Sequence, residues 1–256
     1  MTVAKAAVVG AGTMGRDIAK VLAGAGVEVL LKDVDAALVE IDEPGVTGTT
    51  SYEGFGDVEF VIEAVPEVVE LKQAVFAELD SCTPGQAILA SNTSCLSITE
   101  ISEATVRPDR VVGFHFFYPA TMARLIEVVE GADTAEETVA AATGFAQQLR
   151  KTPIRCGEAP GFVVNRILTA ASSEAWRMVD EEGVSTEEVD AAIKDSGGPV
   201  GPFHLVDLLG LDTVLHVAEH LHASYGGERF YVSEAMRERV RDGHLGVKTG
   251  KGFYEH

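Results

Sequence analysis

Cysteine is scarce in this sequence, which has three among its 256 residues. Cys82, Cys95 and Cys156 form no C-x-x-C pair, and their spacing is not that of a metal site. For an odd number of thiols with such spacing, a reducing cytosol is the simplest explanation.

Long apolar runs are also missing. No uninterrupted stretch approaches the roughly 20 residues that a membrane-spanning helix needs. The apolar N-terminal region contains Lys5, Arg16, Asp17 and Lys20, whereas the hydrophobic core of a signal peptide is uncharged. We therefore expect a cytoplasmic protein without a membrane partner.

Basic residues are few, since 20 Lys and Arg face 40 Asp and Glu, for a formal net charge of −20. Such a surface repels phosphate backbones, so we expect no nucleic-acid partner. The acidic stretch MVDEEGVSTEEVDAAIKD, residues 178 to 195, is typical of a solvated helical face. Adaptation to a salt-rich cytoplasm is the alternative, and the sequence does not separate the two.

What the sequence does contain is a globular composition, 46% hydrophobic and 23% charged, in a chain long enough for two domains. Residues 4 to 9 predict a strand buried on both faces. Apolar residues at helical intervals predict a helix over residues 13 to 25. Between them, Gly10, Gly12 and Gly15 have the G-x-G-x-x-G spacing.

This order of strand, glycine turn and helix predicts a dinucleotide site. Gly10 permits the tight turn, Gly12 lets a pyrophosphate approach the backbone, and Gly15 lets the helix pack closely against the strand. The first helical turn, which includes Thr13 and Met14, supplies unpaired N–H groups and a positive potential to the same ligand.

Asp33 ends the second predicted strand, residues 27 to 33, and lies 18 residues beyond Gly15. A carboxylate at this place accepts hydrogen bonds from the adenosine ribose and repels a 2′-phosphate, so NAD is favoured over NADP. A chance glycine-rich turn in another α/β protein is the alternative.

The remainder of the first 157 residues alternates between strand and helix. Helices are predicted over residues 68 to 80 and 134 to 151. The alternation predicts a largely parallel, Rossmann-type sheet covered on both faces. From residue 158 to residue 256 the pattern is almost wholly helical and predicts an all-α second domain. The further strands are predicted at residues 59 to 65, 87 to 91, 110 to 116, 124 to 130 and 152 to 156.

The hexapeptide FHFFYP, residues 114 to 119, places His115 at the end of a predicted strand. Taken alone, it fits a core histidine bonded to a backbone carbonyl, and it also fits a general base, because an imidazole titrates near neutral pH. The motifs that flank it favour the second interpretation.

These motifs resemble the L-3-hydroxyacyl-CoA dehydrogenase family along nearly the whole chain. The resemblance implies NAD-dependent oxidation of an (S)-3-hydroxyacyl-CoA, short-chain in the first instance, to the 3-oxoacyl-CoA, or the reverse reaction. It also implies a homodimer formed through the helical domain. In chain order the motifs are GAGTMG (10–15), EAVPE (63–67), SNTSCLSITEI (91–101), GFHFFYP (113–119), LIEVVEG (125–131), APGFVVNRI (159–167), GGPVGPF (197–203), LGLDT (209–213) and KTGKGFYEH (248–256).

His115 and Glu127 match the catalytic pair of that family. Oxidation of a secondary alcohol needs a base for the hydroxyl proton while hydride leaves the neighbouring carbon. Glu127 lies on the next predicted strand, where a carboxylate would fix the tautomer of His115 and favour the imidazolium.

Two further positions match catalytic residues of the family. Ser94 matches the serine that hydrogen-bonds the reacting oxygen, with capping of a helix that starts near Leu96 as the alternative. Asn165 matches an asparagine whose amide donates to the developing carbonyl oxygen, and an ordinary polar residue on a helix surface is the alternative.

Three more residues are expected at the cofactor. Glu67 and Lys72 match family positions near the nicotinamide and the substrate, although an exposed Glu–Lys pair on a helix would also explain them. Asn92 belongs to the same SNTS segment as Ser94.

We expect no metal and no covalent catalysis. The chemistry needs no thiol nucleophile, so Cys95 is interpreted as a small buried filler. His216 and His220 lie one helical turn apart beside Glu219, but no further ligands are evident.

The chain departs from the family in two places. The family usually carries a helical hairpin, which helps to cover the CoA moiety, between the second strand and the EAVPE strand. Here only 29 turn-rich residues separate Asp33 from Glu63, so we expect the hairpin to be missing. Tyr118 stands where asparagine is common. Two other hypotheses therefore remain: the same chemistry on a non-CoA 3-hydroxy acid, sugar acid or carrier-protein thioester, and a non-catalytic NAD-binding protein.

Overall fold

The computed structural model describes residues 2 to 256. They form two compact units, which divide between Phe162 and Val163. The sequence pattern places this boundary slightly earlier, after residue 157. The intervening segment belongs to the first unit because Glu158 accepts a hydrogen bond from Ser97 and because Phe162 packs into that unit's core.

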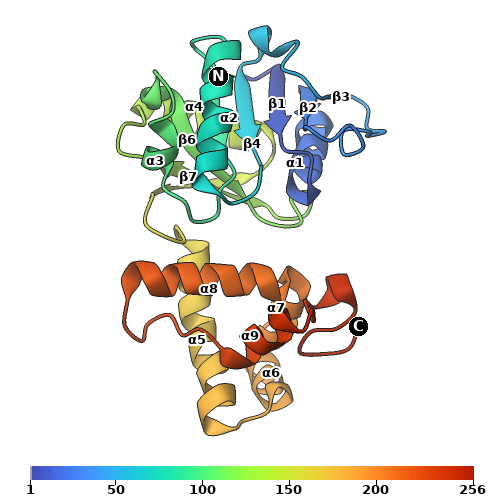
Figure 1. Cartoon of the computed structure of the whole chain (residues 1–256), viewed down its shortest axis with the longest axis vertical. Helices are drawn as coiled ribbons and strands as arrows, with labels where there is room; N and C mark the ends of the chain where they lie inside the picture. Colours follow the sequence, from blue (N-terminus) through green and yellow to red (C-terminus); the bar gives the residue numbers. More distant parts are fainter. Residues whose placement is uncertain (1) are drawn as a thin grey trace. The chain divides into compact units, whose positions relative to one another are not determined.

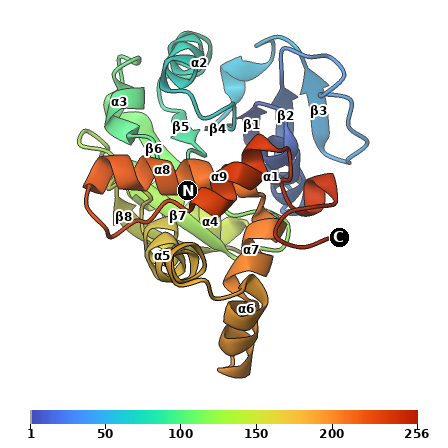
Figure 2. The same ribbon diagram turned by 60° about the horizontal axis from the view of Figure 1, so that its bottom comes forward.

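Within residues 2 to 256, the first unit contains an eight-stranded sheet in the order β3-β2-β1-β4-β5-β6-β7-β8. Neighbouring strands are parallel except for β6 and β7, which are antiparallel. Figure 2 shows the run from β6 to β3 across this unit. The predicted Rossmann-type sheet is therefore confirmed. The strands are β1 (Lys5–Val9), β2 (Glu28–Lys32), β3 (Val46–Thr49), β4 (Phe60–Glu63), β5 (Ile88–Ser91), β6 (Val111–Phe116), β7 (Leu125–Glu130) and β8 (Thr152–Gly157).

Helices cover both faces of this sheet, because its central strands are apolar on both sides. Along β1, Ala6 and Val8 pack in the core with α1 (Thr13–Gly24) and α4 (Glu136–Gln148), whereas Ala7 and Val9 pack in the core with α2 (Val69–Cys82) and α3 (Ile98–Ser102). Figure 1 shows α1 beside β1 and β2, and α2 beside β4. Short 3-10 turns lie at Phe55–Asp57 and Pro108–Arg110.

The connection after β2 is a loop rather than a helical pair. No α-helix lies between β2 and β4 in the described chain, which confirms that the hairpin is missing. Instead, the Arg16 guanidinium on α1 donates to the carbonyls of Leu38, at 2.7 Å, and Glu40, at 3.1 Å. The chain then forms β3, a strand that the sequence pattern did not predict.

The second unit is helical, as predicted, with Trp176, Phe203 and Met236 in its core. Its C-terminal segment is fastened by Asp207, whose carboxylate accepts the backbone N–H groups of Phe253 and Tyr254. None of the helices in residues 2 to 256 combines the length and the apolar character needed to cross a membrane. The helices are α5 (Val164–Glu182), α6 (Thr186–Asp195), α7 (Pro202–Leu209), α8 (Leu211–Tyr225) and α9 (Glu234–Arg241), with a 3-10 turn at Val247–Thr249.

Candidate active site

The glycine turn follows β1 at the carboxyl edge of the sheet, and its three glycines have different surroundings. Gly10 has a φ of +100°, and a Cβ built on it would lie 2.6 Å from the Ala64 carbonyl oxygen. A Cβ on Gly15 would lie 1.7 Å from the Gly10 oxygen. A Cβ on Gly12 would meet no protein atom within 4 Å. Gly10 and Gly15 are therefore required by the fold itself, whereas the space at Gly12 is open to a ligand.

Asp33 lies directly after β2 and is tied to this turn. Its Oδ2 accepts the Ala11 N–H at 2.6 Å, and its Oδ1 accepts the Asp35 N–H at 3.0 Å. A carboxylate held rigidly beside the start of α1 is suited to the hydroxyls of an adenosine ribose. The open space at Gly12, the amides of the first turn of α1 and this carboxylate together fit a dinucleotide.

His115 and Glu127 meet across the antiparallel pair of β6 and β7, where they are register partners. The His115 Nδ1 lies 2.7 Å from the Glu127 Oε2, and the two residues are 4% and 0% exposed. The other ring nitrogen, Nε2, lies 3.1 Å from the Ser94 Oγ. Both nitrogens of His115 thus contact side chains, and not the backbone carbonyl of the core-histidine alternative.

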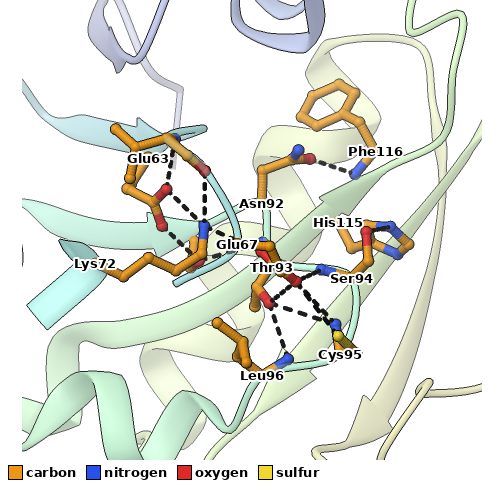
Figure 3. A network of polar contacts seen from close by, with 12 residues as sticks. Glu63, Glu67, Lys72, Asn92, Thr93, Ser94, Cys95, Leu96, His115 and Phe116 are labelled. Atoms are coloured by element: carbon orange, nitrogen blue, oxygen red, sulfur yellow. Dashed lines mark hydrogen bonds and ion pairs between the residues drawn. The ribbon is translucent and has the colours of Figure 1, made fainter. Parts of the chain in front are cut away.

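Ser94 lies in the segment between β5 and α3. Its hydroxyl faces His115 (Figure 3), and it does not cap the helix that follows. The N-cap is Ser97, whose side chain accepts the Glu100 N–H. Capping therefore does not explain Ser94, and α3 begins at Ile98 rather than near Leu96.

Glu67 organises the segment that carries Ser94. Its Oε1 accepts the Thr93 hydroxyl at 2.6 Å and the Ser94 N–H at 2.8 Å. Burial by itself raises the pKa of the Glu67 carboxyl, but the Lys72 ammonium and these hydrogen bonds outweigh burial and lower the pKa. Glu67 is thus a partly buried acceptor that stays charged.

Lys72 is not the exposed helix lysine of the alternative interpretation, because it is 1% exposed. Its Nζ donates to the Glu63 Oε1 at 2.7 Å and to the Val65 carbonyl at 3.2 Å, and it lies 3.3 Å from the Glu67 Oε2. Burial raises the pKa of Glu63, while Lys72 opposes that shift. The Lys72 ammonium is therefore paired with the two carboxylates and the carbonyl.

Asn92 joins the ends of two strands. Its Oδ1 accepts the Phe116 N–H at 2.9 Å, and its own N–H donates to the Glu63 carbonyl at 2.8 Å. The aromatic rings of Phe117 and Phe162 lie against the imidazole, with centroids 4.6 and 5.8 Å from that of His115. Sequence reasoning did not single out Phe117 or Phe162, although Phe117 belongs to the FHFFYP motif.

The remaining candidates are Asn165 and Cys95. Asn165 belongs to the second unit, where it is half-buried on the first turn of α5. Cys95 is buried, and burial together with the Glu67 carboxylate raises the pKa of its thiol to about 12. Among residues 2 to 256, no group of three or more His, Cys, Asp or Glu side chains has the arrangement of a metal site.

Comparison with known proteins covers both units. The model described as "3-hydroxyacyl-CoA dehydrogenase, NAD binding domain" matches residues 5–44 and 40–159, and the model of the C-terminal domain of the same family matches residues 161–256. The first match is split at the loop that replaces the hairpin.

Individual relatives match over 90% or more of their length. The 3-hydroxybutyryl-CoA dehydrogenase of Clostridioides difficile is 37% identical, over 98% of this chain and 99% of the relative. The mitochondrial hydroxyacyl-coenzyme A dehydrogenase of Sus scrofa is 33% identical, over 97% and 90%. Among solved structures, the (S)-3-hydroxybutyryl-CoA dehydrogenase PaaH1 of Ralstonia eutropha has a TM-score of 0.91 at 36% identity, and the match covers 100% of this chain and 99% of that one.

Proposed function

Because this chain belongs to the 3-hydroxyacyl-CoA dehydrogenase family and is an NAD-binding oxidoreductase, we propose that it oxidises short-chain (S)-3-hydroxyacyl-CoA thioesters to 3-oxoacyl-CoA, or catalyses the reverse. Two bacterial relatives are named as 3-hydroxybutyryl-CoA dehydrogenases, which supports a short acyl chain in the substrate. NAD, when bound, supplies the chemistry of hydride exchange with the carbinol carbon.

The observation that carries the proposal is the line Ser94–His115–Glu127. An ionised carboxylate can only accept, so Glu127 beside Nδ1 makes that nitrogen the protonated one. The Nε2 of His115 is then left with a lone pair, directed at the Ser94 hydroxyl. In the oxidation Nε2 takes the proton of the substrate hydroxyl, and the buried Glu127 carboxylate stabilises the imidazolium that results. In the reduction the same proton returns to the carbonyl oxygen.

Other residues bind and orient the reactants. We assign the pyrophosphate to Gly12 and to the first-turn amides of Thr13 and Met14, and the adenosine ribose to Asp33. Ser94 donates to the reacting oxygen, and Asn165 supplies a second donor to it.

A direct test follows NADH absorbance with acetoacetyl-CoA in wild type and in His115→Gln. General acid–base catalysis contributes about 10²- to 10⁴-fold, so kcat should fall by that factor. His244→Gln, in the helical unit, is the matched control and should keep wild-type activity. Normal activity in His115→Gln would remove His115 from this role.

The carrier is tested with the same assay. Comparing acetoacetyl-CoA with free acetoacetate, a sugar acid and a carrier-protein thioester separates the proposed substrate from the non-CoA alternative. Tight NAD binding with no turnover on any of them would instead favour a non-catalytic protein.

We also propose a homodimer formed through the helical unit. That unit exposes several large apolar side chains, which a subunit interface would bury. Sedimentation at micromolar concentration should show a dimer, and a monomer alone would contradict the proposal. The exposed side chains include Ile167, Leu168, Ile193, Leu208, Leu209 and Val247.

A further inference from the structure

One carboxylate oxygen holds the whole turn that presents Ser94. Besides the Thr93 hydroxyl and the Ser94 N–H, the Oε1 of Glu67 accepts the Cys95 N–H at 3.3 Å (Figure 3). Three consecutive residues are thus oriented by a single atom. Because Ser94 lies in the middle of the three, the place of its hydroxyl relative to His115 depends on where Glu67 is held.

Glu67 is held in turn by Lys72. The second oxygen of Glu67, Oε2, lies 3.3 Å from the Lys72 Nζ. Lys72 cannot swing away, because it is buried and also donates to Glu63 and to the Val65 carbonyl. Glu63 is itself fixed at the end of β4 by the Ser91 hydroxyl, at 2.7 Å. The result is a continuous chain of contacts from β4 through α2 to the Ser94 turn, in which Glu63 and Lys72 are buried and Glu67 is partly buried.

We propose that Lys72 is a positioning residue for the reaction: anchored by Glu63, it keeps Glu67 oriented and ionised, so that Glu67 sets the Ser94 hydroxyl against the His115 Nε2. This rests on the proposed function of Ser94 and His115. It gives Lys72 and Glu67 a role that acts through the Ser94 turn, beside the cofactor contacts expected for both residues.

A buried ion pair that merely stabilised the fold would leave the pH dependence of catalysis unchanged. Positioning through a charged carboxylate would change it, because Glu67 without Lys72 is a partly buried acid whose pKa rises. As the pH falls through that raised pKa, Glu67 takes up a proton and becomes a weaker acceptor for the Ser94 turn. Lys72→Met should therefore gain an acidic limb in kcat that wild type lacks.

The other titratable groups facing Glu67 can be told apart from it. Cys95 stays protonated throughout, because the pKa of its thiol is about 12. His115, which contacts Ser94, is the same residue in wild type and variant. Glu63, which loses the same ammonium, is separated by double variants: Lys72→Met with Glu67→Gln should lose the acidic limb, and Lys72→Met with Glu63→Gln should keep it.

The experiment measures kcat and the KM for NAD between about pH 5 and pH 8 with acetoacetyl-CoA. At the acidic end of this range, protonation of Glu67 in Lys72→Met replaces a charged acceptor with a neutral one, and kcat should fall about tenfold. The acidic limb in kcat is specific to positioning, because loss of a cofactor contact by Lys72 would raise the KM for NAD at every pH. Lys5→Met, which removes a lysine paired with Asp57 at the opposite end of β1, should match wild type.

Two further measurements keep the inference testable if Lys72→Met does not fold. Glu67→Gln changes a side chain that is 24% exposed, and it should lower kcat about tenfold at every pH. In the ligand-free protein, the ¹⁵N shift of the His115 Nε2 should move in both variants, because its contact with Ser94 is altered. An inactive wild-type protein would overturn the proposed function. If wild type is active, and folded variants keep its kcat profile and its Nε2 shift, the role of Lys72 alone is overturned.

Discussion

Replacement of Glu127 by glutamine removes one negative charge with almost no change in shape. The Glu127 side chain is fully buried, and its Oε2 lies 2.7 Å from the His115 Nδ1. At an effective dielectric constant of about 20, opposite unit charges roughly 4 Å apart attract by about 4 kcal/mol. That attraction exists only while His115 carries the substrate proton, so most of its loss should appear in the transition state.

The expected effect of Glu127→Gln is a fall in kcat of between about 10²- and 10³-fold, since each 1.36 kcal/mol is a factor of ten in rate. The KM for NAD should change little, because the glycine turn follows β1 whereas Glu127 lies on β7. Stopped-flow measurement of NADH with acetoacetyl-CoA gives both constants.

The matched control for this variant is Glu130→Gln. Glu130 lies three residues further along β7, where it pairs with Arg155 at the surface, so its replacement should leave kcat unchanged. If Glu127→Gln retained more than a third of wild-type kcat while Glu130→Gln was normal, the carboxylate would not stabilise the imidazolium and the reasoning would be refuted.

Three further predictions concern the cofactor turn and pH. Gly12→Ala should fold with an unchanged Tm but bind NAD at least about tenfold more weakly. Gly15→Ala should lose about 3 kcal/mol or more of unfolding free energy, because the new Cβ meets the Gly10 oxygen. Equal Tm values for the two variants would contradict this prediction. Asp33→Ala should raise the KM for NAD about tenfold and reduce the preference for NAD over NADP, as measured by kcat/KM with each cofactor. The folded-state pKa of Glu67 lies below its ordinary value of 4.5, so its stabilising contribution is present above that value and is lost as the pH falls through the lower, folded pKa; urea unfolding should show a steeper acid loss in wild type than in Glu67→Gln.

Local patterns made the first half of the fold predictable. The strand, glycine turn and helix around Gly10 follow from neighbours in the sequence, and the structure places Asp33 beside them. Strand β3 was missed because its sequence VTGT is short, contains glycine and has no buried residue. The segment around Glu158 belongs to the first unit through a contact with Ser97, which no local pattern reveals.

The site was predictable only where residues lie at strand ends. His115 and Glu127 were placed on successive strands, but the antiparallel register that makes them direct partners could not be read from sequence. The exposed alternative for Lys72 failed for a physical reason: a lysine on a helix is usually solvated, but this one is buried because it pairs with Glu63 from a neighbouring strand. Glu63 carried no separate signal beyond its place in the EAVPE motif.

The most direct measurement of the central claim is a crystal structure of the protein with NAD and acetoacetyl-CoA bound together. The account predicts that the C3 oxygen of the ligand lies within hydrogen-bonding distance, about 2.6 to 3.2 Å, of the His115 Nε2. A ligand whose C3 oxygen lies away from His115, with Nε2 still bonded only to Ser94, would contradict it.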